Sequence, residues 1–108
     1  MPRLPLIHFE GALFHITARG NNKQLIFNQQ KDFQRYLKNL EQAKKKFPFK
    51  LYSFVLMPNH VHLLIEVKKH PINKIMQAIQ TGYTMYFNKK YERTGHLFQG
   101  PYHSFLVD

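Results

Sequence analysis

The stretch from Phe49 to Val67 constrains the fold more than any other part of this chain. It holds two runs rich in aromatic, β-branched and other apolar residues, Phe49–Met57 and His60–Val67, and only Pro58 and Asn59 separate them. Runs of this length and composition are typical of β-strands, and a Pro-Asn pair is typical of a tight turn. We therefore expect an antiparallel β-hairpin, around which the remaining elements are arranged.

Each side of this hairpin carries a further strand and a helix. Leu13–Arg19 alternates like a strand and ends at the turn residues that begin with Gly20. Apolar residues at helical spacing predict a helix from the candidate N-cap Asn28 to about Lys46, with a stripe of Phe33, Leu37, Leu40, Ala43 and Phe47. A second helix is predicted from about Pro71 to Asn88, with a stripe of Ile72, Ile75, Met76, Ile79, Tyr83 and either Tyr86 or Phe87.

A last strand is predicted within His96–Val107, interrupted near Gly100 and Pro101. The element order is then β-α-β-β-α-β, the split βαβ pattern. We expect an α+β, ferredoxin-like fold with a four-stranded antiparallel sheet and both helices on one of its faces. The other face of the sheet stays open to a ligand.

Composition indicates one domain and an anionic partner. We expect residues 1–108 to form a single core, because 44% of the residues are hydrophobic. The formal net charge of +10 favours nucleic acid or a membrane surface as partner, against a basic protein with no polyanion partner. The absence of cysteine excludes disulfide scaffolds, cysteine zinc sites and thiol nucleophiles. Without a transmembrane run or a signal peptide, we expect a cytoplasmic protein that does not enter membranes.

His60 and His62 are the candidate metal ligands. They are separated by one residue on a predicted strand, so both side chains point to the same face while Val61 points to the other. If Val61 packs under the helices, the two imidazoles lie on the open face, where they can bind one divalent metal and leave coordination positions free. The alternative is two half-exposed strand residues without a ligand.

The segment Leu56-Met57-Pro58-Asn59-His60-Val61-His62-Leu63-Leu64 closely resembles the HUH motif of single-tyrosine transposases, the insertion-sequence-200-like and REP-associated enzymes. Phe14–Asn22 resembles their first strand and loop, and Tyr86–Gly100 resembles the segment between their second helix and fourth strand. The resemblance implies a ferredoxin-like fold that binds single-stranded or hairpin DNA. It implies Mg²⁺ or Mn²⁺ on His60 and His62, a tyrosine nucleophile, a 5′-phosphotyrosine intermediate and strand joining by the reverse step. It also allows a homodimer.

The nucleophile is where this chain departs from the family pattern. The family's tyrosine sits on a helix after the fourth strand, so residues 1–108 are expected to be a core domain without that helix. The chain is then a fragment, a degenerate member, or one in which an internal tyrosine has taken the role. Tyr83 and Tyr86 follow the histidines on a helix, but the apolar stripe places Tyr83 against the sheet, so the catalytic residue stays unassigned.

Basic and polar residues near the ends of the strands and helices are the candidate DNA contacts, since residues at the rims of the open face can contact phosphates. Phe98, Tyr102 and His103 either stack on unpaired bases or belong to the core. The competing functions are a nickase and joining enzyme, a DNA-binding remnant without chemistry, and a ferredoxin-like RNA-binding module. The predicted DNA-binding residues are Arg19, Asn21, Asn22, Lys23, Asn59, Lys89, Lys90, Arg93, His96 and Gln99.

Overall fold

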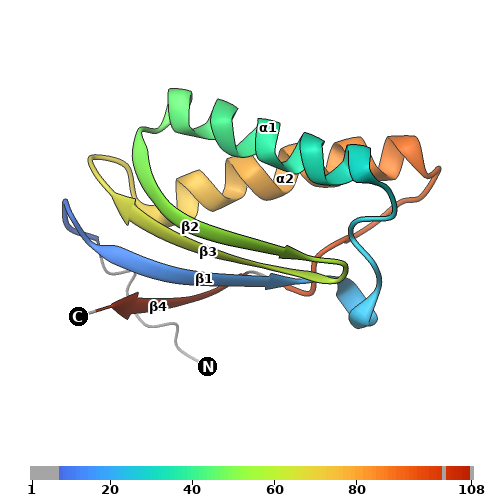
Figure 1. Cartoon of the computed structure of the whole chain (residues 1–108), viewed down its shortest axis with the longest axis horizontal. Coiled ribbons are helices and arrows are strands. Elements are labelled where there is room, and N and C mark those ends of the chain that lie inside the picture. Colours follow the sequence, from blue (N-terminus) through green and yellow to red (C-terminus); the bar gives the residue numbers. More distant parts are fainter. Residues whose placement is uncertain (1–7, 101, 108) are drawn as a thin grey trace.

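A computed structural model describes residues 8–100 and 102–107. In this part of the chain a four-stranded antiparallel sheet has the order β2-β3-β1-β4, and both helices cover one face of it (Figure 1). The predicted ferredoxin-like α+β fold is confirmed. The elements are β1 (Leu13–Arg19), the 3-10 turn η1 (Asn21–Lys23), α1 (Gln30–Lys46), β2 (Phe49–Met57), β3 (His60–Val67), α2 (Ile72–Lys90) and β4 (His103–Val107).

Strand β3 lies inside the sheet, paired with β2 on one side and β1 on the other. Its side chains alternate between the two faces, as the period of two along a strand requires. Val61, Leu63, Ile65 and Val67 are buried beneath the helices, whereas His60, His62, Leu64 and Glu66 are half-buried on the open face.

The predicted β-hairpin is confirmed, with Met57 opposite His60 and Leu56 opposite Val61. A bulge between Leu51 and Ser53 shifts the register of β2, which forms one edge of the sheet. Such a bulge twists an edge strand and disturbs its pairing.

Helix α1 begins one residue later than predicted, with Gln29 and not Asn28 at the N-cap. The carboxylate of Asp32 accepts the backbone N–H groups of both residues, at 2.9 and 3.1 Å. The predicted stripe is wrong at Leu37, which is 37% exposed. Tyr36 is buried in its place, because its ring packs against that of Tyr83 in α2, 5.3 Å away.

Helix α2 follows its predicted stripe closely. Its buried residues are Ile72, Ile75, Met76, Ile79, Tyr83 and Phe87. Tyr86 is only partly buried and packs against the core from the side. Neither helix of the described residues has the length and apolarity needed to cross a membrane.

The last strand is shorter than predicted, because the residues before Gly100 form no regular ladder. Only Phe98 makes an isolated bridge, to Gly20, and β4 starts at His103 opposite Thr17. Gly100 has a φ of +56°, which breaks an extended strand. Pro101 lies outside the described residues.

Candidate metal and nucleic-acid site

His60 and His62 lie side by side on the open face, at the end of the sheet where β1 ends and β3 begins. Their ring centroids are 5.0 Å apart and the rings are perpendicular. His15 of β1 stacks on His62 with a centroid distance of 5.4 Å. The register also sets Arg19 opposite His60 and Thr17 opposite His62.

The Nδ1 atom of each histidine makes a hydrogen-bond contact with a polar side chain. His60 Nδ1 lies 2.8 Å from the amide oxygen of Asn59, and His62 Nδ1 lies 3.3 Å from the hydroxyl of Thr17. Because the Asn59 oxygen only accepts, His60 Nδ1 donates, and the lone pair of His60 lies on Nε2. Metal-binding histidines are commonly held this way through the nitrogen that does not bind the metal.

The surroundings of His62 favour its neutral imidazole. Burial lowers the pKa of His62, and the nearby His60, His15 and Arg19 lower that pKa further. The neutral form is the one that binds a metal. Within residues 8–100 and 102–107, no group of three or more His, Asp or Glu side chains is arranged around a metal position. The candidate ligands here are therefore the two imidazoles of His60 and His62.

A small hollow of about 270 Å³ adjoins His60. Its other lining residues include four predicted DNA contacts, Arg19, Lys23, Asn59 and Gln99. The lining has two cationic side chains and no carboxylate, which suits a phosphate group.

Gly20 lets the chain build this hollow. A Cβ atom at Gly20 would lie 2.1 Å from the backbone oxygen of Gln24, so only glycine permits the close turn after β1. The turn is held by a bond from Lys23 N–H to the Gly20 carbonyl and by one from Gly20 N–H to the Asn59 carbonyl. These bonds tie η1, which carries Lys23, to the turn between β2 and β3.

The remaining predicted DNA contacts lie outside this hollow. Asn21 and Asn22 are in η1, where the backbone N–H of Asn21 donates to Leu97. Lys89 and His96 are exposed at and beyond the end of α2. Arg93 donates to the side chains of Asn88 and Gln24 and so organises the loop after α2.

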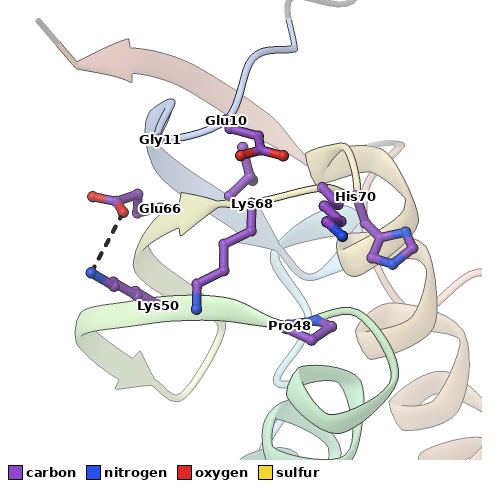
Figure 2. Close-up of a pocket in the computed structure, with 9 residues that line it drawn as sticks. Glu10, Gly11, Pro48, Lys50, Glu66, Lys68 and His70 are labelled. Atoms are coloured by element: carbon purple, nitrogen blue, oxygen red, sulfur yellow. Dashed lines mark ion pairs between the residues drawn. The ribbon is translucent and has the colours of Figure 1, made fainter.

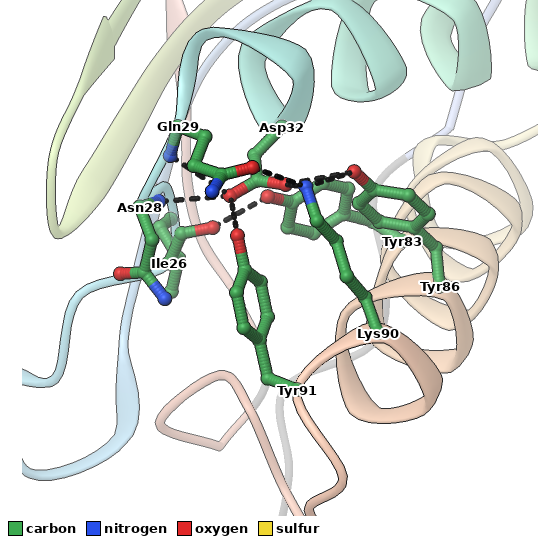
Figure 3. Close-up of polar contacts among 8 residues, drawn as sticks. All are labelled: Ile26, Asn28, Gln29, Asp32, Tyr83, Tyr86, Lys90 and Tyr91. Atoms are coloured by element: carbon green, nitrogen blue, oxygen red, sulfur yellow. Dashed lines mark hydrogen bonds and ion pairs between the residues drawn. The ribbon is translucent and has the colours of Figure 1, made fainter.

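Lys90 is held in a polar cluster that joins the two helices (Figure 3). Its ammonium group lies 2.8 Å from the fully buried carboxylate of Asp32 and 2.9 Å from the amide oxygen of Gln29. Tyr86 and Tyr91 donate to the same carboxylate, at 2.7 and 2.6 Å. The partly exposed ammonium group of Lys90 is therefore paired with a buried carboxylate.

Tyr83 and Tyr86 lie on the helix side of the sheet, whereas the histidine pair is on the open face. Tyr83 is buried and donates its hydroxyl to the backbone carbonyl of Ile26, and Tyr86 donates to Asp32 (Figure 3). Burial raises the pKa of Tyr83, and the negative charge of Asp32 raises that pKa further. Both hydroxyls are thus protonated and engaged.

Sequence reasoning did not single out His15 and Thr17. The signal was the alternation of β1, which puts His15, Thr17 and Arg19 on one face. Only the cross-strand register shows that this face adjoins His60 and His62.

A larger hollow of about 700 Å³ lies at the opposite end of the sheet (Figure 2). It is lined by Lys68, Lys69 and His70 and by Glu10 and Glu66. Glu66 lies 3.9 Å from Lys50 and is separated from His60 by about 20 Å of strand, at about 3.3 Å per residue. This hollow is separate from the histidine site, and its lining mixes the two carboxylates with Lys50, Lys68 and Lys69.

Comparison with known proteins places the chain in a family. The family model described as "Transposase IS200 like" matches residues 8–108. No curated protein sequence matches the chain.

Two solved structures share the fold. A REP-associated tyrosine transposase bound to a REP hairpin has a TM-score of 0.70 and 13% identity, over 100% of this chain and 63% of that one. A candidate transposase from Deinococcus radiodurans R1 has a TM-score of 0.68 and 16% identity, over 100% of this chain and 87% of that one. The match of the family model over nearly the whole chain, on the same fold, means that this protein belongs to the IS200-like transposase family.

Proposed function

We propose that this transposase cleaves and rejoins single-stranded or hairpin DNA in a metal-dependent reaction through a 5′-phosphotyrosine intermediate. One observation carries the proposal: His60 and His62 are adjacent on the open face, each with Nδ1 engaged, beside a basic hollow. The structural relative bound to a REP hairpin supports hairpin DNA as the substrate class.

His60 and His62 would hold Mg²⁺ or Mn²⁺ through their Nε2 atoms. The bound cation would supply Lewis-acid polarisation of a phosphodiester oxygen. Asn59 and Thr17 hold the rings in place, and Arg19 and Lys23 bind the phosphates on either side of the cleaved bond. Gln99 and Asn59 offer amide groups to a base or a sugar.

The nucleophile in this proposal is a tyrosine hydroxyl that attacks a DNA phosphodiester and leaves a free 3′-OH. Tyr83 and Tyr86 are disfavoured by their place on the helix side of the sheet. We propose that residues 1–108 act as the core domain that binds metal and DNA in this reaction.

A DNA adduct assay tests this function. Labelled hairpin DNA with single-stranded flanks is incubated with the protein and Mn²⁺, and covalent adducts are resolved on a denaturing gel. His60→Ala is compared with His70→Ala, which removes an imidazole at the opposite end of the sheet. Mn²⁺ binding to each variant is measured separately by paramagnetic resonance.

We expect His60→Ala, and not His70→Ala, to lose Mn²⁺ binding and metal-dependent action on DNA. A tyrosine adduct identifies the nucleophile by peptide mapping. Equal Mn²⁺ binding by the wild type and His60→Ala would refute the metal site.

A DNA-binding remnant without chemistry is the second candidate. The burial of Tyr36 and the hydrogen bonds made by the hydroxyls of Tyr83, Tyr86 and Tyr91 on the helix side favour it. It predicts binding of hairpin DNA that depends on the histidine pair, with no adduct when the protein is supplied alone.

A further inference from the structure

A second hollow of about 610 Å³ lies on the open face, next to the histidine site. It is lined by Thr17, Arg19, Gln99, Tyr102, His103 and Phe105, together with Gly100. None of these side chains is acidic. The hollow therefore differs from the one at the far end of the sheet, which Glu10 and Glu66 help to line (Figure 2).

Two residues connect this hollow to the histidine pair. Thr17 lies opposite His103 on one side and opposite His62 on the other, and its hydroxyl contacts His62 Nδ1. Arg19 lines both this hollow and the hollow of about 270 Å³ that is also lined by His60. A DNA strand with one phosphate at His60 would thus have a neighbouring nucleotide within reach of this hollow.

Phe105 is the most unusual residue of the lining. It lies opposite His15 in the register and leaves 64% of its surface exposed on the open face. Exposed aromatic rings are platforms for unpaired bases, because every base has a flat π-face. The Gln99 amide and the Arg19 guanidinium provide donors at the rim for a base edge or a phosphate.

We propose that this hollow binds one unpaired nucleobase of the DNA strand, stacked on Phe105, next to the phosphate held at His60 and His62. The inference rests on the proposed function and adds to it a base-binding subsite on β4. Of the aromatic residues considered in the sequence, Phe98 is buried in the core, Tyr102 is half-buried and lines the hollow, and His103 is exposed.

Abasic scanning tests the subsite. A single abasic nucleotide is moved along the single-stranded flank of a hairpin oligonucleotide, and affinity is measured by fluorescence anisotropy for the wild type and Phe105→Ala. Val107→Ala is the matched control, because Val107 lies on the same strand and face, is 40% exposed and does not line the hollow. Circular dichroism verifies that each variant is folded.

We expect one abasic position to weaken wild-type binding about tenfold, the usual order for loss of a stacked base. Phe105→Ala should bind intact DNA with an affinity that is lower by the same factor. An abasic nucleotide at that position should cause no further loss of affinity in Phe105→Ala, and Val107→Ala should bind like the wild type. A fluorescent base analogue at that position should be quenched by the wild type only.

Two results would overturn the subsite. One is that Phe105→Ala binds intact DNA as tightly as the wild type does. The other is that Phe105→Ala lowers the affinity by the same factor whichever position is abasic. Retained Mn²⁺ binding and metal-dependent DNA binding in that variant would leave the proposed function standing. No binding of any oligonucleotide by the wild type would overturn both proposals.

Discussion

At the residue scale, the orientation of two imidazole rings decides what the open face can bind. His60 is held through Nδ1 by Asn59, the residue immediately before it, and His62 by Thr17 from the neighbouring strand. One contact within a turn and one contact between strands thus orient the two rings. A local turn supplies the first, and a cross-strand pair supplies the second.

Replacing Asn59 tests whether its side chain fixes the tautomer of His60. Asn59→Ala removes the acceptor for His60 Nδ1, so the tautomers of His60 mix and Mn²⁺ affinity should fall about 10- to 100-fold. Asn59→Asp keeps an acceptor oxygen and should retain Mn²⁺ binding. Nitrogen-15 chemical shifts of the imidazole, recorded without metal, report the tautomer directly. A single unchanged His60 tautomer in Asn59→Ala would show that Asn59 has no such role.

At the element scale, Asp32 joins the start of α1 to the end of α2. Its carboxylate accepts two backbone N–H groups at the start of α1 and bonds from Tyr86, Lys90 and Tyr91 (Figure 3). Burial by itself would raise the pKa of Asp32, but the hydrogen bonds from Lys90, Tyr91 and Tyr86 outweigh it and hold that pKa well below its usual range. The carboxylate is therefore charged in the folded protein at neutral pH.

Asp32→Asn should destabilise the fold by about 2–4 kcal/mol, because it removes one partner of a buried charged pair. The pKa of Asp32 is lower in the folded state than in the unfolded one. Its stabilising contribution is thus present above about pH 4, the unfolded pKa, and is lost as the pH falls. Urea unfolding measured between pH 3 and 7 should show that the free energy of unfolding falls less at acid pH in Asp32→Asn than in the wild type.

Glu41→Gln is the control for this prediction, since Glu41 is an exposed acid on the same helix. It should follow the wild-type pH profile. An Asp32→Asn profile parallel to that of the wild type would mean that other acids cause the loss of stability in acid.

At the scale of the whole molecule, the sheet separates a packed side from a binding side. The helices cover one side of the sheet (Figure 1). The buried tyrosines and the Asp32 cluster lie on that side, and the histidines with both neighbouring hollows lie on the other. A net charge of +10 attracts a polyanion to the molecule in general, and among the described residues the open face is the one that carries the histidine pair and the hollow beside Phe105.

Thiol protection tests which side the DNA covers, and the natural absence of cysteine makes the test simple. Val55→Cys places a thiol on the open face opposite His62, and Met85→Cys places one on α2; both positions are exposed, at 51% and 68%. Bound hairpin DNA should slow alkylation several-fold at position 55 and leave position 85 unchanged. Equal protection at both, or protection at position 85 alone, would contradict this placement.

The sequence by itself determined the fold class, the β-hairpin and the placing of His60 and His62 on one face. These features depend on local patterns: alternation with a period of two, helical spacing, and a two-residue turn. The sequence also places Asn59 at the site, because this residue directly precedes His60 in the chain. The errors at Leu37, at the start of α1 and at the start of β4 are also local, at positions where packing or one glycine overrides the pattern.

Only the tertiary structure decided which distant residues share the site. The β1–β3 register brings Thr17 and Arg19 to the histidines, the β1–β4 register adds His103 and Phe105, and the turn at Gly20 adds Lys23. The same is true of the ion pair between Lys90 and Asp32, which depends on the packing of α1 against α2. Strand register and helix packing are set by contacts between residues far apart in the chain, so no local pattern contains them.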